Sequence, residues 1–237
     1  MRVTFLAHSG FLVELPEVCL LFDYWKGELP SLPESPLAVF VSHRHPDHFD
    51  PAIFSLAEGR EDVTFVLSKD IRPKKLEKLG LPDGLRERVV SVGPDETFSL
   101  PGLGLTAETL RSTDEGVAFV VTCGEKTLYH AGDLNWWSWE EESDGYNRNM
   151  EVDFKRYLEP LRNRHLDVAF VPLDPRLGDR YGLGLDWLLR TAQVDRVFPM
   201  HLWNEFGLIE RFRAEHPDLS PAVVSVEREG QSWSLPD

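Results

Sequence analysis

Three histidines and one aspartate lie within six consecutive positions of this chain. They form the pattern H-x-H-x-D-H, in which the named residues are His43, His45, Asp47 and His48. Imidazole nitrogens and carboxylate oxygens are ligands for Zn²⁺, Fe and Mn²⁺ in proteins. Because residues i and i+2 of an extended segment share a face, we expect His43 and His45 to bind one ion. Asp47 and His48, in the turn that follows, can point into the same cavity and bind a second ion.

Two further candidate ligands follow apolar, strand-like runs downstream. Asp133 comes after the run that ends at His130, and His201 comes directly after Met200 at the end of another run. Loops that follow strand ends are the usual place for a site in a layered α/β protein. Either residue alone would more often be a cap or a surface group, but together with the first motif they predict a metal centre. We expect His130, which lies inside its strand, to support a ligand or the core rather than to bind metal.

Three residues are candidates for the substrate pocket: His8, Trp136 and Trp137. His8 lies in a predicted hairpin turn, where it is either a simple turn residue or a pocket residue that could also reach the metal. Trp136 and Trp137 follow Asp133 closely, so their loop must border the site. We expect both rings to form an apolar wall, with capping of the core as the alternative. Asp174 is expected to be a turn residue, with support of a ligand as the alternative.

Short apolar runs and helical periodicity predict the elements that position these residues. Strands are expected at residues 3–7, 11–15, 18–22, 37–41, 63–67, 88–92, 96–100, 103–109, 117–122, 126–130, 167–171 and 196–198, with Pro172 and Pro199 ending the last two, and residues 223–226 and 231–235 are expected to form a closing hairpin. Helices are expected at residues 51–58, capped by Asp50, and at residues 74–79, 151–162, 185–192 and 205–215. Two sheets covered by helices would use all of these elements in a single α/β (α+β) domain over residues 1–237.

Composition excludes several classes of protein. The chain has 237 residues, with 40 acidic against 25 basic side chains and a net charge of −15. This charge argues against binding to nucleic acid, which requires a basic surface. No apolar run of about 18 residues predicts a membrane span, and the first residues do not form a signal peptide. The two cysteines lie in apolar runs and are expected to be free thiols of a cytoplasmic protein.

With these motifs the sequence resembles the metallo-β-lactamase superfamily over nearly its whole length. The resemblance rests on the H-x-H-x-D-H motif at residues 43–48, on Asp133 and on His201 as the last histidine of the set. Softer features at residues 8–10 and 172–178 resemble the cytosolic metal-dependent hydrolases that include L-ascorbate-6-phosphate lactonase. The resemblance implies a four-layer αββα sandwich with metal ions at one edge of the paired sheets and Asp133 as the bridging carboxylate.

One ligand of this family is missing from the sequence. The first metal site normally takes a third histidine from a loop before the bridging carboxylate, but no histidine lies between His48 and His130. Asp114 or Glu115 could supply an oxygen ligand instead, which would favour Mn²⁺ or Fe, or His8 could reach the site. The third possibility, ranked slightly first, is that only the second site is filled, because it keeps four ligands. These ligands are Asp47, His48, Asp133 and His201.

The resemblance implies a metal-dependent hydrolase that uses a metal-bound hydroxide. Asp47 would orient the water or accept its proton, besides binding metal. We expect one or two Zn²⁺ ions, with Mn²⁺ or Fe as alternatives, and a small-molecule ester, lactone or phosphoester as substrate. The competing hypothesis is a non-catalytic member of the fold that binds a metal or a metabolite, because fold alone does not establish activity. The sequence does not indicate the oligomeric state.

Overall fold

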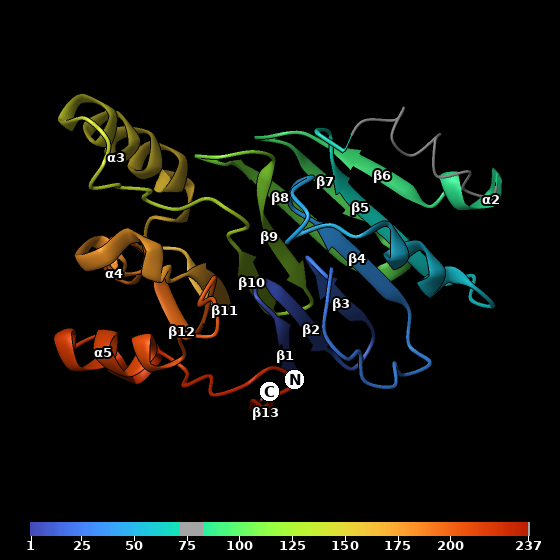
Figure 1. Cartoon of the computed structure of the whole chain (residues 1–237). Coiled ribbons are helices and arrows are strands. Elements are labelled where there is room, and N and C mark those ends of the chain that lie inside the picture. The colour runs from blue at the N-terminus through green and yellow to red at the C-terminus, as the bar shows by residue number, and fades with distance from the viewer. Residues whose placement is uncertain (72–82, 237) are drawn as a thin grey trace.

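Two β-sheets packed face to face, with helices on their outer faces, make up the structure (Figure 1). The computed structural model describes residues 1–71 and 83–236, so the helix expected at residues 74–79 lies outside the described residues. Three long helices cover one sheet, and a short helical segment packs on the other. The expected four-layer αββα sandwich is therefore confirmed.

The first sheet has, in the described part of the chain, seven strands in the order β13-β1-β2-β3-β4-β5-β6. They are β1 (Arg2–Ala7), β2 (Gly10–Glu14), β3 (Cys19–Phe22), β4 (Leu37–Val41), β5 (Val63–Ser68), β6 (Val89–Val92) and β13 (Ser232–Ser234). Two short helices belong to this half, η1 (Pro51–Ala57) and α2 (Asp83–Arg86). Asp50 caps η1 as expected, because its side chain accepts a hydrogen bond from the backbone N–H of Ala52.

The second sheet has six strands among the described residues, in the order β12-β11-β10-β9-β8-β7. They are β7 (Thr97–Leu100), β8 (Leu105–Arg111), β9 (Val117–Cys123), β10 (Lys126–His130), β11 (His165–Pro172) and β12 (Gln193–Met200). The helices on its outer face are α3 (Asp144–Leu158), α4 (Leu183–Thr191) and α5 (Gly207–Glu215), and the remaining short turns are η2 (Pro101–Leu103), η3 (Glu159–Leu161), η4 (Pro175–Arg180) and η5 (Ser220–Ala222).

Strand β4 shows how the apolar runs build the layers. Side chains of a strand alternate between its two faces. Phe40 points into the core between the sheets, where its ring lies 5.2 Å from that of Phe119 on β9. Val39 and Val41 point the other way and pack with Ile53 of η1. A strand buried on both faces must be apolar at every position, which is the pattern that β4 has.

Three features of the expected elements are corrected. Helix α3 begins at Asp144 rather than at residue 151, because the Ser143 hydroxyl accepts from the backbone N–H of Tyr146 and caps the helix. Pro199 does not end its strand but pairs within β12, and Pro172 is itself the last paired residue of β11 rather than the residue after it. Strand β12 is an edge strand and β11 extends past the last pairing with β10, so neither proline removes a needed hydrogen bond there.

The C-terminal segment does not form the expected hairpin. Val223 bridges in parallel to Val197 of β12, whereas β13 pairs with β1 of the other sheet. The segment between them therefore passes from one sheet to the other. The Phe5 N–H donates a hydrogen bond of 2.9 Å to the Gln231 carbonyl and so attaches this segment to β1 of the first sheet.

The candidate ligands lie at the carboxyl ends of strands that run in one direction within each sheet. In the first sheet β1 and β4 are parallel to each other, and in the second sheet β8, β10 and β12 share one direction. The residues that follow these strand ends are His8, His43, Asp114, Asp133 and His201. Parallel strands end at a common edge, so a single edge of the sandwich carries the whole set.

Two glycines allow the ligand loops to approach one another. Gly116 and Gly132 both have positive φ angles, 71° and 51°. A Cβ atom on Gly116 would lie 2.0 Å from the Ser42 carbonyl oxygen, and one on Gly132 would lie 2.7 Å from the Ser42 Cβ. Ser42 directly precedes His43. The absence of side chains at these two positions therefore lets the loops of Asp114 and Asp133 pack against the start of the motif.

We predict that Gly116→Ala lowers the free energy of unfolding by about 3 kcal/mol or more, because strain at positive φ and overpacking add. Gly124→Ala is the matched control, since Gly124 also has a positive φ, 57°, but nothing lies within 4 Å of the added Cβ. The control should lose only about 1 kcal/mol. Equal losses for the two variants in urea unfolding would contradict the close approach at Ser42.

Candidate metal centre

Four side chains form a first group of potential ligands: His43, His45, Asp114 and Asp133. One nitrogen or oxygen atom from each lies within 4.8 Å of the others. The distances are 2.9 Å from His43 Nε2 to His45 Nδ1 and 3.3 Å from His43 Nε2 to Asp133 Oδ2. Asp114 Oδ2 lies 3.7 Å from His45 Nδ1. The group offers two imidazole nitrogens and two carboxylate oxygens to one position.

Three histidines form a second group beside the first: His8, His48 and His201. The Nε2 atoms of His48 and His201 lie 3.0 Å apart. Asp133 Oδ1 lies 3.2 Å from His48 Nε2 and 2.9 Å from His201 Nε2. The two oxygens of one carboxylate therefore face different groups, Oδ2 the first and Oδ1 the second.

Metal ions fit these two groups better than hydrogen bonds do. Asp133 Oδ1 and His8 Nε2 are buried and make no hydrogen bond of good geometry among the described residues, although each lies within ion-pair distance of a neighbour, His201 Nε2 at 2.9 Å and Asp47 Oδ2 at 3.4 Å. A tetrahedral Zn²⁺ with ligands at about 2.1 Å holds neighbouring ligand atoms about 3.4 Å apart, close to the spacings found here. A bound cation would give both atoms a ligand bond. The donor set is also the one that Zn²⁺, Fe or Mn²⁺ requires.

The buried charges shift one another's pKa. Burial alone would raise the pKa of Asp133, but the positive charges of His48 and His201 outweigh it and hold that pKa well below the ordinary value. Burial alone would lower the pKa of His48, but Asp133 and Asp23 raise it to about 10. Burial lowers the pKa of His8 to about 4, against the opposing effect of Asp47. At neutral pH His8 is thus neutral, whereas His48 carries a proton that a metal ion would displace.

Two buried aspartates hold the rings of the second group. Asp23 Oδ2 lies 2.7 Å from His48 Nδ1, and the same carboxylate accepts hydrogen bonds from the backbone N–H and the hydroxyl of Ser42. Asp174 Oδ2 lies 3.4 Å from His201 Nδ1. A carboxylate on Nδ1 leaves Nε2 to face the ion. Asp174 also caps η4 by accepting from the Arg176 N–H, so it has both roles that the sequence suggested.

Asp23 is a functional residue that sequence reasoning missed. It follows the end of β3 directly, as Asp133 and His201 follow the ends of other strands within a few residues. The same signal could therefore have found it. His130 has the supporting place expected, since it is fully buried, stacks on Phe22 and lies 2.9 Å from the Ser9 carbonyl oxygen through Nε2.

The geometry separates the acidic candidates for the missing ligand. Asp114 lies in the first group and faces His45 Nδ1, whereas Glu115 forms an ion pair with Arg44 and faces the other nitrogen of that ring, Nε2, at 3.6 Å. Burial raises the pKa of Asp114, and Asp133 raises it further. A carboxyl group destabilised in this way gains from a nearby cation. The structure thus brings an oxygen donor from the loop after β8 into the first group, beside His43 and His45.

Asp47 and His8 lie together at the edge of the second group. Asp47 Oδ2 is 3.4 Å from His8 Nε2. Asp47 lies outside the second group, whose converging donor atoms come from His8, His48 and His201. His8 has a positive φ of 53°, its carbonyl oxygen accepts from the His201 N–H, and its ring centroid lies 3.9 Å from that of His201. His8 thus reaches the metal centre, while Asp47 faces both His8 and the open pocket.

A cavity of about 270 Å³ opens over the first group and His201. Its wall includes Trp137, as expected, but not Trp136. The Trp136 ring packs instead against Phe154 and Trp187 in the helical layer. Successive side chains of an extended segment point in opposite directions, so Trp139 rather than Trp136 shares the pocket with Trp137. The other lining residues are His45, Asp47, Thr113, Asp114, Asp133, Tyr146, Met150, Arg176 and His201.

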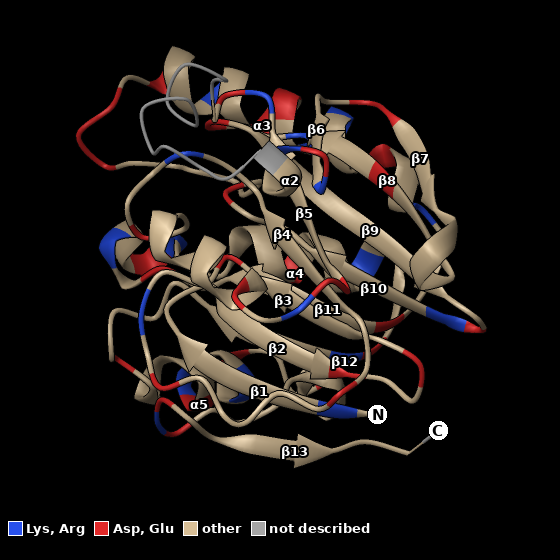
Figure 2. Cartoon of the chain, turned by 90° about the vertical axis from the view of Figure 1, so that its right-hand side faces the viewer, with Lys and Arg blue, Asp and Glu red and all other residues tan. Residues whose placement is uncertain are grey.

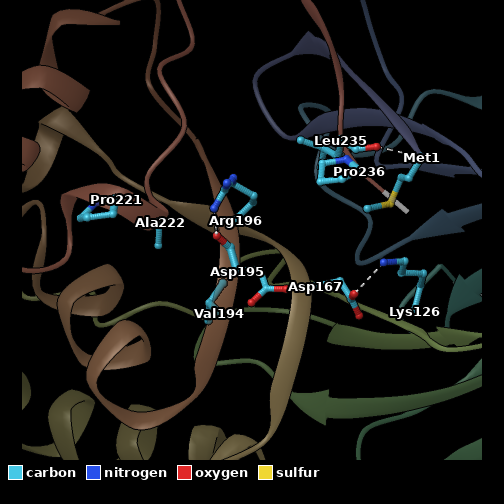
Figure 3. A pocket seen from close by; sticks show the side chains of 10 residues that line it. All are labelled: Met1, Lys126, Asp167, Val194, Asp195, Arg196, Pro221, Ala222, Leu235 and Pro236. Atoms are coloured by element: carbon cyan, nitrogen blue, oxygen red, sulfur yellow. Dashed lines mark hydrogen bonds and ion pairs between the residues drawn. The ribbon is translucent and has the colours of Figure 1, made fainter.

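A second cavity, of about 360 Å³, lies elsewhere, beside the chain termini (Figure 3). Residues at the beginning of β10, β11 and β12 and residues of the two terminal segments line this cavity. Lys126 of β10 forms an ion pair of 3.2 Å with Asp167 there. The described residues that line it include no histidine or cysteine. Because metal ligands and convergent catalytic groups lie at the opposite ends of these strands, the smaller cavity over the histidines is the candidate active site.

Comparison with known proteins agrees with the fold. A family model described as a beta-lactamase superfamily domain matches residues 23–173, which include every candidate ligand except His8 and His201. The chain belongs to the beta-lactamase superfamily. This finding confirms the resemblance that the H-x-H-x-D-H motif indicated.

Relatives in the beta-lactamase superfamily match nearly the whole chain. A protein of Pyrobaculum neutrophilum named UPF0173 metal-dependent hydrolase is 29% identical, covering 99% of this chain and 100% of the relative. One of the same name from Desulforamulus reducens is 28% identical and covers 89% and 88%. The solved structure of Igni18, a metallo hydrolase from Ignicoccus hospitalis, has a TM-score of 0.64 at 17% identity and covers 99% of both chains. The chain is an enzyme of the metal-dependent hydrolase class.

No helix in the described ranges is long and apolar enough to span a membrane.

We predict that Zn²⁺ binding at pH 7 releases at least one proton, because His48 has a pKa of about 10 before metal binds. A raised pKa means that the ring is protonated below pH 10 and competes with the ion. The apparent affinity should therefore rise about tenfold per pH unit between pH 6 and 8 for each proton released. Calorimetric titrations in buffers of different ionisation enthalpy measure this release. Binding without proton release would contradict the assignment of His48 as a ligand.

Proposed function

We propose that this enzyme binds two divalent metal ions and hydrolyses an ester, lactone or phosphoester of a small metabolite. One observation carries the proposal: the two oxygens of Asp133 face two separate groups of donor atoms. His43, His45 and Asp114 would hold the first ion together with Asp133. His8, His48 and His201 would hold the second together with the other oxygen of Asp133.

The two positions differ in ligand chemistry. The first combines two imidazoles with two carboxylates, and the second combines three imidazoles with a shared carboxylate. Oxygen-rich sites suit harder ions such as Mn²⁺ or Fe, while imidazole-rich sites suit Zn²⁺. We propose Zn²⁺ at the second position, with Mn²⁺ or Fe as alternatives at the first.

The side chains around the ions have distinct roles in hydrolysis. When bound, divalent ions lower the pKa of a coordinated water and stabilise negative charge on the reacting oxygen. Asp47 borders the pocket, and despite the effect of burial its contact with His8 holds its pKa far below the ordinary value. It therefore stays a carboxylate at neutral pH, whose Oδ2 can accept a hydrogen bond from a water and orient it. Trp137 fixes the loop after Asp133, because its Nε1 donates to the Asp133 carbonyl at 2.9 Å.

We also propose a small-molecule partner and a cytoplasmic location. The pocket of about 270 Å³ matches a small metabolite. Figure 2 shows acidic residues, in red, at many of the loops and strand ends, in keeping with a net charge of −15 that repels nucleic acid. Cys19 and Cys123 are both free thiols, which suits a reducing compartment.

Turnover of generic substrates tests the proposed function. Metal-loaded protein should hydrolyse at least one of three probes: 4-nitrophenyl acetate, γ-butyrolactone or bis(4-nitrophenyl) phosphate. Asp133→Ala should lower kcat/KM by more than about a hundredfold, because the shared ligand is lost. Asp153→Ala, which removes a carboxylate from the exposed Arg156 pair on α3, is the control and should keep full activity. Retained turnover in Asp133→Ala would overturn the proposal, and no turnover of any probe by metal-replete protein would favour the non-catalytic hypothesis.

Metal stoichiometry tests the ligand that replaces the missing histidine. Asp114→Ala should lower the bound metal from about two equivalents towards one, because the first position then keeps only two histidines and a carboxylate that it shares with the second position. Glu115→Ala is the matched control, since Glu115 pairs with Arg44 and should leave the stoichiometry unchanged. Equal metal content in the two variants would exclude Asp114 as a ligand.

A further inference from the structure

Arg176 is the permanently cationic side chain among the described residues that line the pocket. The other charged groups there are Asp47, Asp114 and Asp133, whose carboxylates surround the metal positions. A guanidinium at this place has no role in holding cations. Its presence in the pocket wall therefore calls for a different explanation, and that explanation rests on the proposed hydrolytic function.

The guanidinium of Arg176 is held in one position. Asp174 accepts hydrogen bonds from Nε at 2.9 and 3.1 Å and from Nη2 at 2.6 Å. The planar group also lies 4.7 Å from the ring centroid of Trp203 and 5.8 Å from that of Trp139. The hydrogen bonds to Asp174 along one edge of the guanidinium, together with the contacts with the two tryptophan rings, remove most of the rotational freedom of the Arg176 side chain. An arginine fixed in this way is prepared for recognition before any ligand arrives.

Part of the guanidinium remains open for a ligand. Arginine has five N–H donors. Asp174 accepts from the one donor of Nε and from one of the two donors of Nη2. Nη1 has no hydrogen-bond partner in the part of the chain that the structure describes, and the side chain is 49% exposed. The free donors of Nη1 and Nη2 match the two oxygens of a carboxylate.

The same pocket has an apolar side. The rings of Trp137 and Trp139 are nearly parallel, with an interplanar angle of 5° and centroids 6.0 Å apart. Met150 and Tyr146 of α3 complete this wall. Stacked indole rings beside a flexible thioether bind a flat or extended apolar group. The pocket thus presents a metal centre, an apolar wall and a cation to one ligand.

We propose that the substrate is a carboxylate-bearing ester or lactone with an apolar body. Its carboxylate binds the free edge of Arg176, its body lies on Trp137 and Trp139, and its ester carbonyl faces the metal centre. In the reaction the oxygen of a water bonds to the carbonyl carbon and the ester C–O bond breaks. One proton of the water goes to the leaving oxygen, and the products are an acid and an alcohol. Arg176 is unchanged by the step and acts through binding.

A pair of esters that differ only in charge tests this proposal. Mono-4-nitrophenyl glutarate carries a carboxylate where 4-nitrophenyl pentanoate carries a methyl group. The wild-type enzyme should favour the glutarate at least tenfold in kcat/KM. Arg176→Met should bring that ratio close to one, and Arg176→Lys should keep part of it. Arg211→Met is the matched control, because Arg211 also pairs with carboxylates over an aromatic ring but lies outside the pocket, and its ratio should equal the wild-type ratio.

Binding of phenylacetate to metal-loaded protein, followed by tryptophan fluorescence, gives a readout without turnover. Wild type should bind it at least tenfold more tightly than Arg176→Met, with equal metal content in both. If Arg176 only supports Asp174, both esters will lose activity equally and the ratio will persist, which overturns the proposal. Equal use of both esters by wild type also overturns it and leaves the proposed function intact. If neither ester reacts but phenylacetate binding depends on Arg176, the ester substrate is overturned while the carboxylate site stands, and turnover of γ-butyrolactone and bis(4-nitrophenyl) phosphate decides the hydrolytic function separately.

Discussion

The burial of one carboxylate among imidazole rings is the constraint on which the structure depends. Asp133 is 6% exposed and lies against His43, His48 and His201. An ionised carboxylate in such a place is costly unless opposite charge compensates it. Asp133 raises the pKa of His48 and of His201, so that their protons supply that charge in the absence of metal. Divalent ions would supply it with ligand atoms in better geometry. Asp23 and Asp174 orient the rings of His48 and His201 around this carboxylate. Gly116 and Gly132 allow the loops that carry Asp114 and Asp133 to pack close to His43.

The fold brings this charge cluster together because parallel strands end at a common edge. Each candidate ligand follows the end of its own strand. His8 and His201 are far apart in the sequence and come together only because their two sheets pack face to face. The crossing of the C-terminal segment from β12 to β1 joins those sheets near the same strands. A stable αββα core therefore fixes the donor atoms before any ion binds, which reduces the ordering needed on binding.

Much of this arrangement could be predicted from the sequence, since apolar runs and the H-x-H-x-D-H motif are local signals. The motif, Asp133 and His201 were found from strand ends, and Asp114 and His8 were both considered as extra donors. The sequence could not show which of these two side chains reaches the metal centre. That depends on the close approach of the loops at Gly116 and on the positive φ of His8. Asp23 was missed although it directly follows a strand end, the signal that found Asp133 and His201. Arg176 was missed because its place beside Trp139 and Trp203 comes from contacts between segments far apart in the sequence. Trp136 was misplaced because the direction of successive side chains in a loop is set by its packing.

A crystal structure of the zinc-loaded protein, with anomalous scattering measured at the zinc edge, tests the central claim most directly. The account predicts two peaks on either side of the Asp133 carboxylate, about 3.5–4 Å apart. One should lie among His43, His45 and Asp114, and the other among His8, His48 and His201. A single peak, or a second ion bound by Asp47 without His8, would contradict the proposed assignment of ligands.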